Sequence, residues 1–287
     1  MTDFRPRRSV LYLPASNARA LAKAATLPCD GLILDLEDSV APDAKADARE
    51  AACAAVQSGE HGGRELAVRV NGAGTVWHDD DLAAVCAAGP DAIVVPKVDS
   101  AEAVRTLVAT LERHAPERTS LWAMVETPRA MLHAEEIAGA SDRLTVLVMG
   151  TNDLAKELVA EHVPGRAPLL TGLSLALLAA RATGTAILDG VFNDVQDVDG
   201  FLAECRQGRQ LGFDGKTLIH PAQVEGANAA FAPDERAVED ARGILAAWEE
   251  GQGSGVVTYQ GRMIERLHVD SAERTLALHE AITRSSS

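Results

Sequence analysis

Positively charged side chains are scarce in this sequence. Its 287 residues include 27 Lys and Arg against 42 Asp and Glu, which gives a formal net charge of −15 at pH 7. A surface of that sign repels nucleic acid and anionic membranes, so we expect neither as a partner. An anionic small molecule would have to be met by locally placed Arg or Lys side chains.

Two further features are missing: cysteine pairs at metal-binding spacing, and long apolar runs. The four cysteines lie far apart with no Cys-x-x-Cys, which indicates neither a zinc site nor a disulfide framework. No run approaches the roughly 18 apolar residues of a membrane span, and no apolar stretch follows Arg5, Arg7 and Arg8 as in a signal peptide. We therefore expect a soluble cytoplasmic protein with reduced, mostly buried cysteines.

Short apolar runs rich in β-branched residues alternate with Ala- and Leu-rich stretches of helical character. The runs are Ser9–Pro14, Gly31–Asp38, Leu66–Asn71, Ala92–Val98, Leu121–Thr127, Thr145–Gly150, Ala186–Phe192 and Lys216–Pro221. About eight strand–helix units in one chain favour an α/β fold of the (β/α)₈ TIM-barrel type. A doubly wound open sheet is the alternative.

The polar residues fall at the C-terminal ends of these runs, which in a barrel converge on one mouth. Examples are Glu37, Asp38, Arg69, Lys97 and Glu126. Strands also stop simply where polarity begins, so a single polar strand end is ambiguous. Polar residues at most of the strand ends are harder to explain unless these ends share a site.

The chain after the eighth run predicts a separate arm. We assign residues 1–250 to a TIM-barrel catalytic domain and residues 251–287 to a hinge and a C-terminal lid or arm. Gly251, Gly253, Ser254 and Gly255 supply the hinge. The stretch Thr258–Ala281 could then cover its own barrel mouth or reach a neighbouring subunit.

Glu126 and Asp153 are the candidate metal ligands. They follow the fifth and sixth runs, one strand–helix unit apart, so neighbouring strand ends could present two carboxylates to one cation. Mg²⁺ typically takes one or two protein carboxylates together with substrate oxygens and water. Asp153 also stands where it could cap the helix that follows, as an N-cap or first-turn acid.

Arg69 interrupts an apolar strand near its end, which is costly unless the guanidinium meets an anion. A substrate carboxylate would suit it. A buried partner on the preceding strand, Asp35 or Glu37, would suit it equally, because alternation places these two acids on one face.

Two lysines raise the possibility of Schiff-base chemistry, the other route open to barrel aldolases. Only Lys97 stands at the mouth, because Lys216 begins its strand. The Pro96-Lys97-Val98 context carries no sign of a desolvated amine, so the metal-dependent route is favoured.

Six motifs, in order along nearly the whole chain, carry a family resemblance. They are Arg8–Pro14, Leu34–Val40, Val68–Asn71, Val125–Pro128, Gly150–Leu154 and Gly215–Pro221. Together they resemble the citrate lyase β-subunit-like enzymes of the HpcH/HpaI aldolase superfamily. The resemblance implies a TIM barrel, Mg²⁺, a homotrimer or larger homo-oligomer, and chemistry on malyl-, citramalyl- or citryl-type thioesters of coenzyme A.

The resemblance also implies roles for single residues. The metal carboxylates fall on Glu126 and Asp153, with Glu126 also at the substrate, and the arginine for the substrate carboxylate falls on Arg69. Further substrate contacts, including the thioester carrier, fall on Tyr12, Arg19, Glu37, Asp38, Ile219 and His220.

The C-terminal arm departs from the family pattern. In the coenzyme A lyases of the family, a neighbouring subunit brings an Asp in a Gly-x-Met-[Val/Ile]-Asp context, where this chain has Gly261-Arg262-Met263-Ile264-Glu265. Glutamate moves the carboxylate by one methylene, roughly 1.5 Å, and a misplacement of about 1 Å can cost ~10²-fold in rate.

From these residues we expect Mg²⁺-dependent carbon–carbon cleavage of a 2-hydroxyacyl-CoA such as malyl-CoA or citramalyl-CoA, giving acetyl-CoA and a 2-oxo acid, with Arg69 and Glu265 as catalytic residues. The alternatives are a malyl-CoA-type thioesterase, a citrate lyase β subunit acting on a carrier-protein thioester, and a non-catalytic barrel that binds CoA esters.

Overall fold

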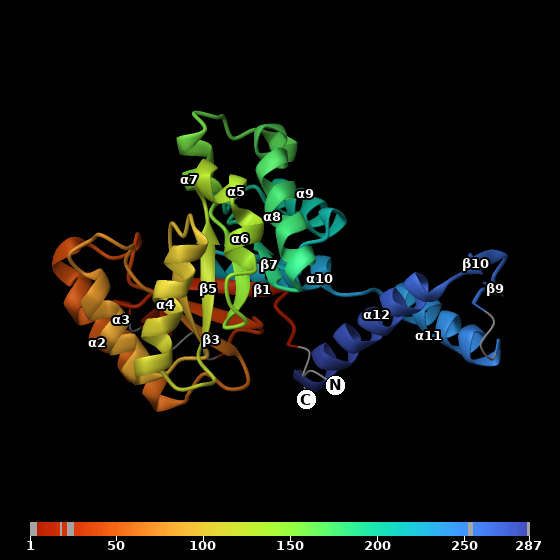
Figure 1. Cartoon of the computed structure of the whole chain (residues 1–287), viewed down its shortest axis with the longest axis horizontal. Helices are drawn as coiled ribbons and strands as arrows, with labels where there is room; N and C mark the ends of the chain where they lie inside the picture. Colours follow the sequence, from red (N-terminus) through yellow and green to blue (C-terminus); the bar gives the residue numbers. More distant parts are fainter. Residues whose placement is uncertain (1–4, 18, 22–25, 252–254, 286–287) are drawn as a thin grey trace. The chain divides into compact units, whose positions relative to one another are not determined.

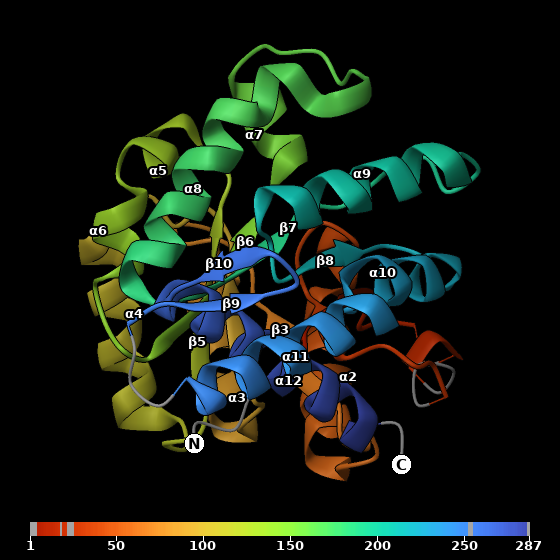
Figure 2. The ribbon, with the colours of Figure 1, turned by 90° about the vertical axis from the view of Figure 1, so that its right-hand side faces the viewer.

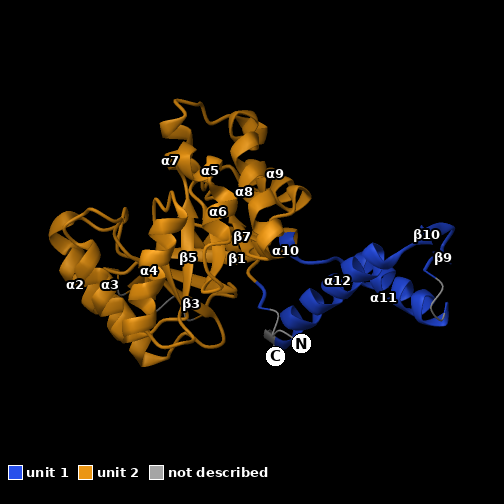
Figure 3. Cartoon of the chain, viewed as in Figure 1, with its two compact units in different colours: residues 1–6, 231–287 blue, residues 7–230 orange. Residues whose placement is uncertain are grey.

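The protein, described by a computed structural model over residues 5–17, 19–21, 26–251 and 255–285, divides into two compact units. One unit spans residues 7–230, and the other joins residues 231–287 with residues 1–6 (Figure 3). Each unit has an apolar core of its own.

Eight parallel strands of the first unit close into a barrel in sequence order, and β1 pairs with β8 (Figure 1). The strands are β1 (Ser9–Pro14), β2 (Gly31–Asp35), β3 (Glu65–Arg69), β4 (Ala92–Val95), β5 (Ser120–Val125), β6 (Leu144–Met149), β7 (Ala186–Asp189) and β8 (Gly215–Leu218). The predicted (β/α)₈ barrel is confirmed, and the open-sheet alternative is wrong. Several strands end before the predicted runs do, because the polar ends of those runs form loops at the mouth.

Helices lie outside the strands (Figure 1). The main ones are α2 (Lys45–Ser58), α3 (His78–Ala88), α4 (Ala101–His114), α5 (Pro128–Leu132), α6 (Ala134–Ala138), α7 (Thr151–Glu157), α8 (Leu170–Thr183), α9 (Val198–Leu211) and α10 (Val224–Phe231), with 3₁₀ turns η1 (Pro42–Ala44), η2 (Pro164–Leu169) and η3 (Pro221–Gln223). On one side α5 and α6 pack against α8 (Figure 2). No helix of the described chain is long and apolar enough to cross a membrane.

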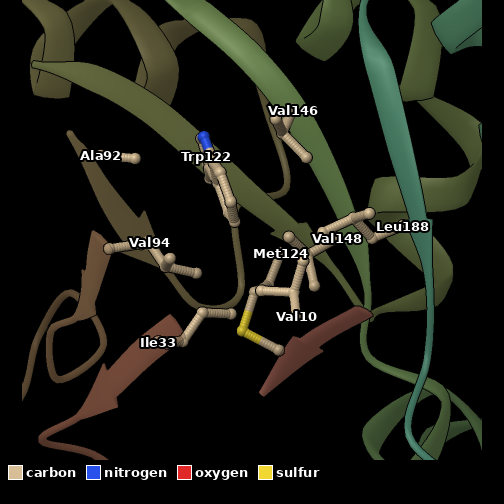
Figure 4. Close-up of a cluster of buried hydrophobic side chains, with 10 residues drawn as sticks. Val10, Ile33, Ala92, Val94, Trp122, Met124, Val146, Val148 and Leu188 are labelled. Carbon is tan, nitrogen blue, oxygen red and sulfur yellow. The ribbon is translucent and has the colours of Figure 1, made fainter. Parts of the chain in front are cut away.

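Alternation along the strands determines which residues reach the mouth. The barrel interior is filled by an apolar cluster that includes Val10, Ile33, Ala67, Trp122 and Met124 (Figure 4). Side chains two residues apart on a strand share a face. The next interior positions along β1, β2, β3 and β5 are therefore occupied by Tyr12, Asp35, Arg69 and Glu126, respectively.

The second unit consists of α11 (Glu235–Glu250), the antiparallel strands β9 (Val257–Tyr259) and β10 (Arg262–Ile264), and α12 (Arg266–Ser285). Its core joins Ile244 of α11, Ile264 of β10 and Val269 of α12. Helix α11, which we assigned to the barrel domain, thus belongs to the compact unit that begins at Phe231. Of the predicted hinge, Gly253 and Ser254 lie outside the described residues.

Replacing Ile33 with alanine tests the barrel core. Ile33 is fully buried in the interior cluster, and its truncation should lower the free energy of unfolding by about 2–5 kcal/mol. Urea unfolding followed by tryptophan fluorescence measures the loss. The control Leu132→Ala alters a side chain that is 79% exposed and should change stability by no more than about 0.5 kcal/mol. Equal losses in both variants would contradict this packing.

Candidate active site

A cavity of about 290 Å³ opens at the C-terminal ends of the barrel strands. Its wall brings together predicted site residues that are far apart in sequence. These are Tyr12, Asp38, Arg69, Glu126, Asp153 and Ile219.

Glu126 follows β5 directly and is almost fully buried, with 2% of its surface exposed. Its Oε1 accepts the backbone N–H of Lys97 at 2.8 Å, from a residue held in the left-handed region at φ 55°. On its other side stands Gly150, where an added Cβ would lie 2.0 Å from Glu126 Oε2. The backbones of two neighbouring loops thus confine this carboxylate.

Burial, followed by the charges of Asp153 and Glu37, raises the pKa of Glu126 to about 7. Burial also raises the pKa of Glu37 to about 7, although Arg69 opposes the shift. Both shifts have the sign that burial gives a carboxyl group, and neighbouring acids add to them.

Asp153 lies in the first turn of α7, whose N-cap residue is Gly150, and no side chain caps that helix. The Asp153 carboxylate lines the cavity, and its Oδ1 lies 3.6 Å from Lys97 Nζ. The N-cap alternative is therefore wrong. As a first-turn acid, Asp153 still directs its charge to the mouth.

Arg69 pairs with Asp35 and Glu37, the buried partners that the sequence analysis gave as an alternative to a substrate carboxylate. Its Nε and Nη2 donate to the two oxygens of Asp35 at 2.6 and 2.8 Å, and its Nη1 lies 2.9 Å from Glu37 Oε2. The guanidinium stacks over the ring of Tyr12, with 4.8 Å between Cζ and the ring centroid. Arg69 also lines the cavity, so its structural pairing and a contact with ligand are compatible.

Burial by itself would raise the pKa of Asp35, but hydrogen bonds and charge from Arg69 outweigh burial and lower it. Asp35 therefore stays ionised and holds the arginine. Burial raises the pKa of the Tyr12 hydroxyl well above its usual value, so that group stays protonated.

Both candidate Schiff-base lysines lie beside carboxylates. Burial would lower the pKa of Lys97, but Asp153 and Glu37 raise it, which is the wrong direction for a Schiff-base lysine. Lys216 is fully buried in ion pairs with Asp189 and Glu204.

Of the residues assigned to the thioester carrier, Tyr12 lies under Arg69 on the cavity wall beside the buried acids, and the other three are exposed. Ile219 is 41% exposed on the cavity wall. His220 is exposed and its Nδ1 accepts the backbone N–H of Ala222, which caps η3. Arg19 is exposed in a short helical segment.

Glu265 belongs to the second unit, directly before α12. Its backbone N–H donates to His268 Nδ1 at 3.0 Å. The neighbouring Arg266 pairs with Asp270 and Glu273, and no ion pair of the Glu265 carboxylate is found among the described residues.

The chemistry of the donors fits a hard cation. Within the described residues no group of three or more His, Cys, Asp or Glu side chains forms a metal site. Magnesium needs fewer, since it commonly keeps several waters and takes one or two carboxylates. The buried Glu126 and the nearby Asp153 supply oxygen donors and uncompensated negative charge, so these two residues would hold the ion.

Sequence reasoning missed two backbone features of this site, the close approach of Gly150 to Glu126 and the left-handed conformation of Lys97. A glycine directly after a strand was a visible signal for the first. Nothing in the local sequence signals the second, since lysine has no preference for that conformation.

Residues 8–221 match the HpcH/HpaI aldolase/citrate lyase family, and residues 170–281 match the C–C bond lyases of the TIM-barrel fold. The chain belongs to the HpcH/HpaI aldolase/citrate lyase family. Within it the chain is citrate lyase β-subunit-like.

Three relatives illustrate this similarity. A (3S)-malyl-CoA thioesterase of Cereibacter sphaeroides is 51% identical over 96% of both chains. The citrate lyase subunit beta of Escherichia coli is 36% identical over 96% of this chain and 94% of its own. The structure of CitE from Mycobacterium tuberculosis in complex with magnesium, acetoacetate and coenzyme A has a TM-score of 0.77 at 32% identity, covering 93% of this chain and 96% of that one.

Replacing Gly150 with alanine should displace Glu126. The backbone at Gly150, with φ −98°, accepts alanine, but the new Cβ would stand 2.4 Å from Glu126 Cβ. We expect Mg²⁺ affinity to fall by roughly 10- to 100-fold in isothermal titration calorimetry. Gly63→Ala is the matched control, since a Cβ there meets nothing within 4 Å. Unchanged affinity in Gly150→Ala would argue against Glu126 as a ligand.

Magnesium affinity should depend on pH around neutrality. Glu126 must be ionised to bind a cation, and its raised pKa of about 7 means that protons compete as the pH falls through 7. Between about pH 8 and pH 6 we expect roughly tenfold weaker binding. Calorimetry at the two pH values measures it, and equal affinities would contradict the shifted pKa.

Proposed function

We propose that this protein is a magnesium-dependent enzyme that hydrolyses the thioester of a malyl-CoA-type substrate, a coenzyme A ester whose hydroxyl group is next to its free carboxylate. The observation that carries the proposal is the cavity that combines Glu126 and Asp153 with Arg69. Similarity to the (3S)-malyl-CoA thioesterase, at 51% identity, supports hydrolysis as the outcome. Glu265, in place of the aspartate of the family's lyases, supports it as well.

In this proposal each site residue contacts a different part of the substrate. Arg69, fixed by Asp35, pairs with the free carboxylate of the acyl group. Bound Mg²⁺ would supply the positive charge that orients and polarises the substrate oxygens. Tyr12, Arg19, Ile219 and His220 contact the thioester and its coenzyme A portion.

Glu265 acts as the general base, from the arm of a neighbouring subunit in a homotrimer or larger homo-oligomer. Its carboxylate takes a proton from water as the water oxygen attacks the thioester carbonyl. The C–S bond then breaks, Glu265 returns the proton to the leaving sulfur, coenzyme A departs as the thiol, and the free hydroxy acid is released. The Glu265 carboxylate forms no ion pair among the described residues, where the neighbouring Arg266 pairs with other acids, so it is available to act as a base.

Carbon–carbon cleavage is the second candidate, favoured by the family match and by the CitE structure with magnesium, acetoacetate and coenzyme A. The bond between the α carbon and the hydroxyl-bearing β carbon of the thioester would break to give acetyl-CoA and a 2-oxo acid, and Glu265 would exchange the proton with the acetyl carbon. In the reverse direction the same site would join acetyl-CoA to glyoxylate or pyruvate.

Product analysis separates the candidates. With (3S)-malyl-CoA and Mg²⁺ we expect free coenzyme A and malate, without acetyl-CoA or glyoxylate, and no turnover in EDTA. Chromatography of the acyl-CoA pool with a thiol assay measures both. Acetyl-CoA with glyoxylate would indicate the lyase. Turnover of the carrier-protein thioester alone would indicate a citrate lyase β subunit, and binding without turnover a non-catalytic barrel.

Mixing inactive subunits tests the source of the base. Glu265→Gln should lower kcat by roughly 10²- to 10⁴-fold, and Asp153→Asn should be inactive through loss of the metal. If Glu265 serves a neighbouring subunit, co-assembly of the two variants rebuilds intact sites and restores part of the activity. No recovery in mixed oligomers, confirmed by mass spectrometry, would contradict the role in a neighbour's site.

A further inference from the structure

Lys45, the first residue of α2, is a buried cation that does not line the cavity. Only 5% of its surface is exposed, and within the described part of the chain its ammonium forms no ion pair with a carboxylate. Burial of an ammonium is costly unless hydrogen bonds satisfy it. A role in holding its hydrogen-bond acceptors in position would explain why Lys45 is buried.

All three ammonium protons have acceptors at the ends of β2 and β3. Lys45 Nζ donates to the carbonyl oxygens of Leu36 at 2.8 Å and Glu37 at 2.7 Å, and to Asn71 Oδ1 at 2.7 Å. Its ammonium also lies 5.1 Å from the centroid of the Trp77 ring. One side chain thus joins the loops that follow two adjacent strands.

Asn71 links the lysine to a charge further from the mouth. Its Nδ2 donates to Leu36 O at 3.0 Å and to Asp81 Oδ2 at 2.6 Å, and Asp81 in turn accepts from Arg49 Nε at 2.7 Å. This network anchors Lys45 through Asn71, so the lysine cannot move without breaking several hydrogen bonds.

The turn that Lys45 holds carries the acids that pair with Arg69. In the same turn, the Asp35 carboxylate accepts the backbone N–H groups of Glu37 at 2.9 Å and Ser39 at 3.1 Å. Asp35 thus fixes the N–H groups, and Lys45 fixes the carbonyls. The Glu37 carboxylate held between them lies 2.9 Å from Arg69 Nη1.

We propose that Lys45 is a positioning residue for carboxylate recognition. By fixing the turn after β2 to the end of β3, it places Glu37 against Arg69 and so sets the orientation of the guanidinium that receives the acid. The inference rests on the proposed function, in which Arg69 binds the substrate carboxylate. Loss of Lys45 should therefore affect the acid part of the ligand and spare the coenzyme A part.

The test compares two ligands on the full-length protein. Dissociation constants for pyruvate with Mg²⁺, and for coenzyme A, are measured by calorimetry in wild type, Lys45→Met and Lys45→Arg. Lys156→Met, which alters an exposed lysine on α7, is the control. We expect Lys45→Met to weaken pyruvate binding roughly tenfold or more and to change coenzyme A binding by less than about twofold.

Lys45→Arg keeps the charge with a different donor geometry, so it should also weaken pyruvate binding and spare coenzyme A. It decides the matter if Lys45→Met does not fold. Unchanged pyruvate affinity, or equal weakening of both ligands, would overturn the positioning role. A wild-type protein that binds pyruvate but does not hydrolyse malyl-CoA would contradict the proposed function alone. A wild type that binds no 2-oxo acid would overturn both.

Discussion

Crowding of negative charge at the barrel mouth is the constraint on which the rest of the site depends. Five carboxyl groups gather there with only two cations; the acids are Asp35, Glu37, Asp38, Glu126 and Asp153, and the cations are Arg69 and Lys97. Like charges in a partly buried site repel and resist ionisation. A bound cation relieves that repulsion, so the arrangement favours a metal before any substrate arrives.

The fold holds these acids in place through its backbone more than through ion pairs. Glu126 is confined between the N–H of Lys97 and Gly150, and the left-handed conformation of Lys97 costs of order 1–3 kcal/mol. Such a cost persists only where the surroundings enforce it. The acids on β2 are held differently, by a turn fixed through both Asp35 and Lys45.

Much of the barrel was predictable because its strands bury both faces and read as apolar runs. Alternation also placed Asp35 and Glu37 on one face as possible partners of Arg69, and the structure pairs Arg69 with both. The capping alternative for Asp153 could not be decided from the sequence, because capping depends on backbone angles around Gly150.

The boundary before α11 was missed for a similar reason. Amphipathic helices look alike whether they cover a barrel or pack against an arm, as α11 does against α12.

What the local sequence could not supply are contacts between segments far apart. Lys45 reads as one polar residue near a helix start, and only the fold brings it to the carbonyl of Leu36 and the amide of Asn71. Glu265 is the converse case. Its departure from the family pattern was visible in the sequence, whereas the groups that its carboxylate meets do not follow from the local sequence.

The central claim is that Glu126 and Asp153 together hold the catalytic metal, and a crystal grown with Mn²⁺ in place of Mg²⁺ tests it most directly. Anomalous scattering locates the ion without reference to the protein chain. The account predicts a peak at the barrel mouth within bonding distance of one carboxylate oxygen from each residue. A peak elsewhere, or an ion bound without either carboxylate, would contradict it.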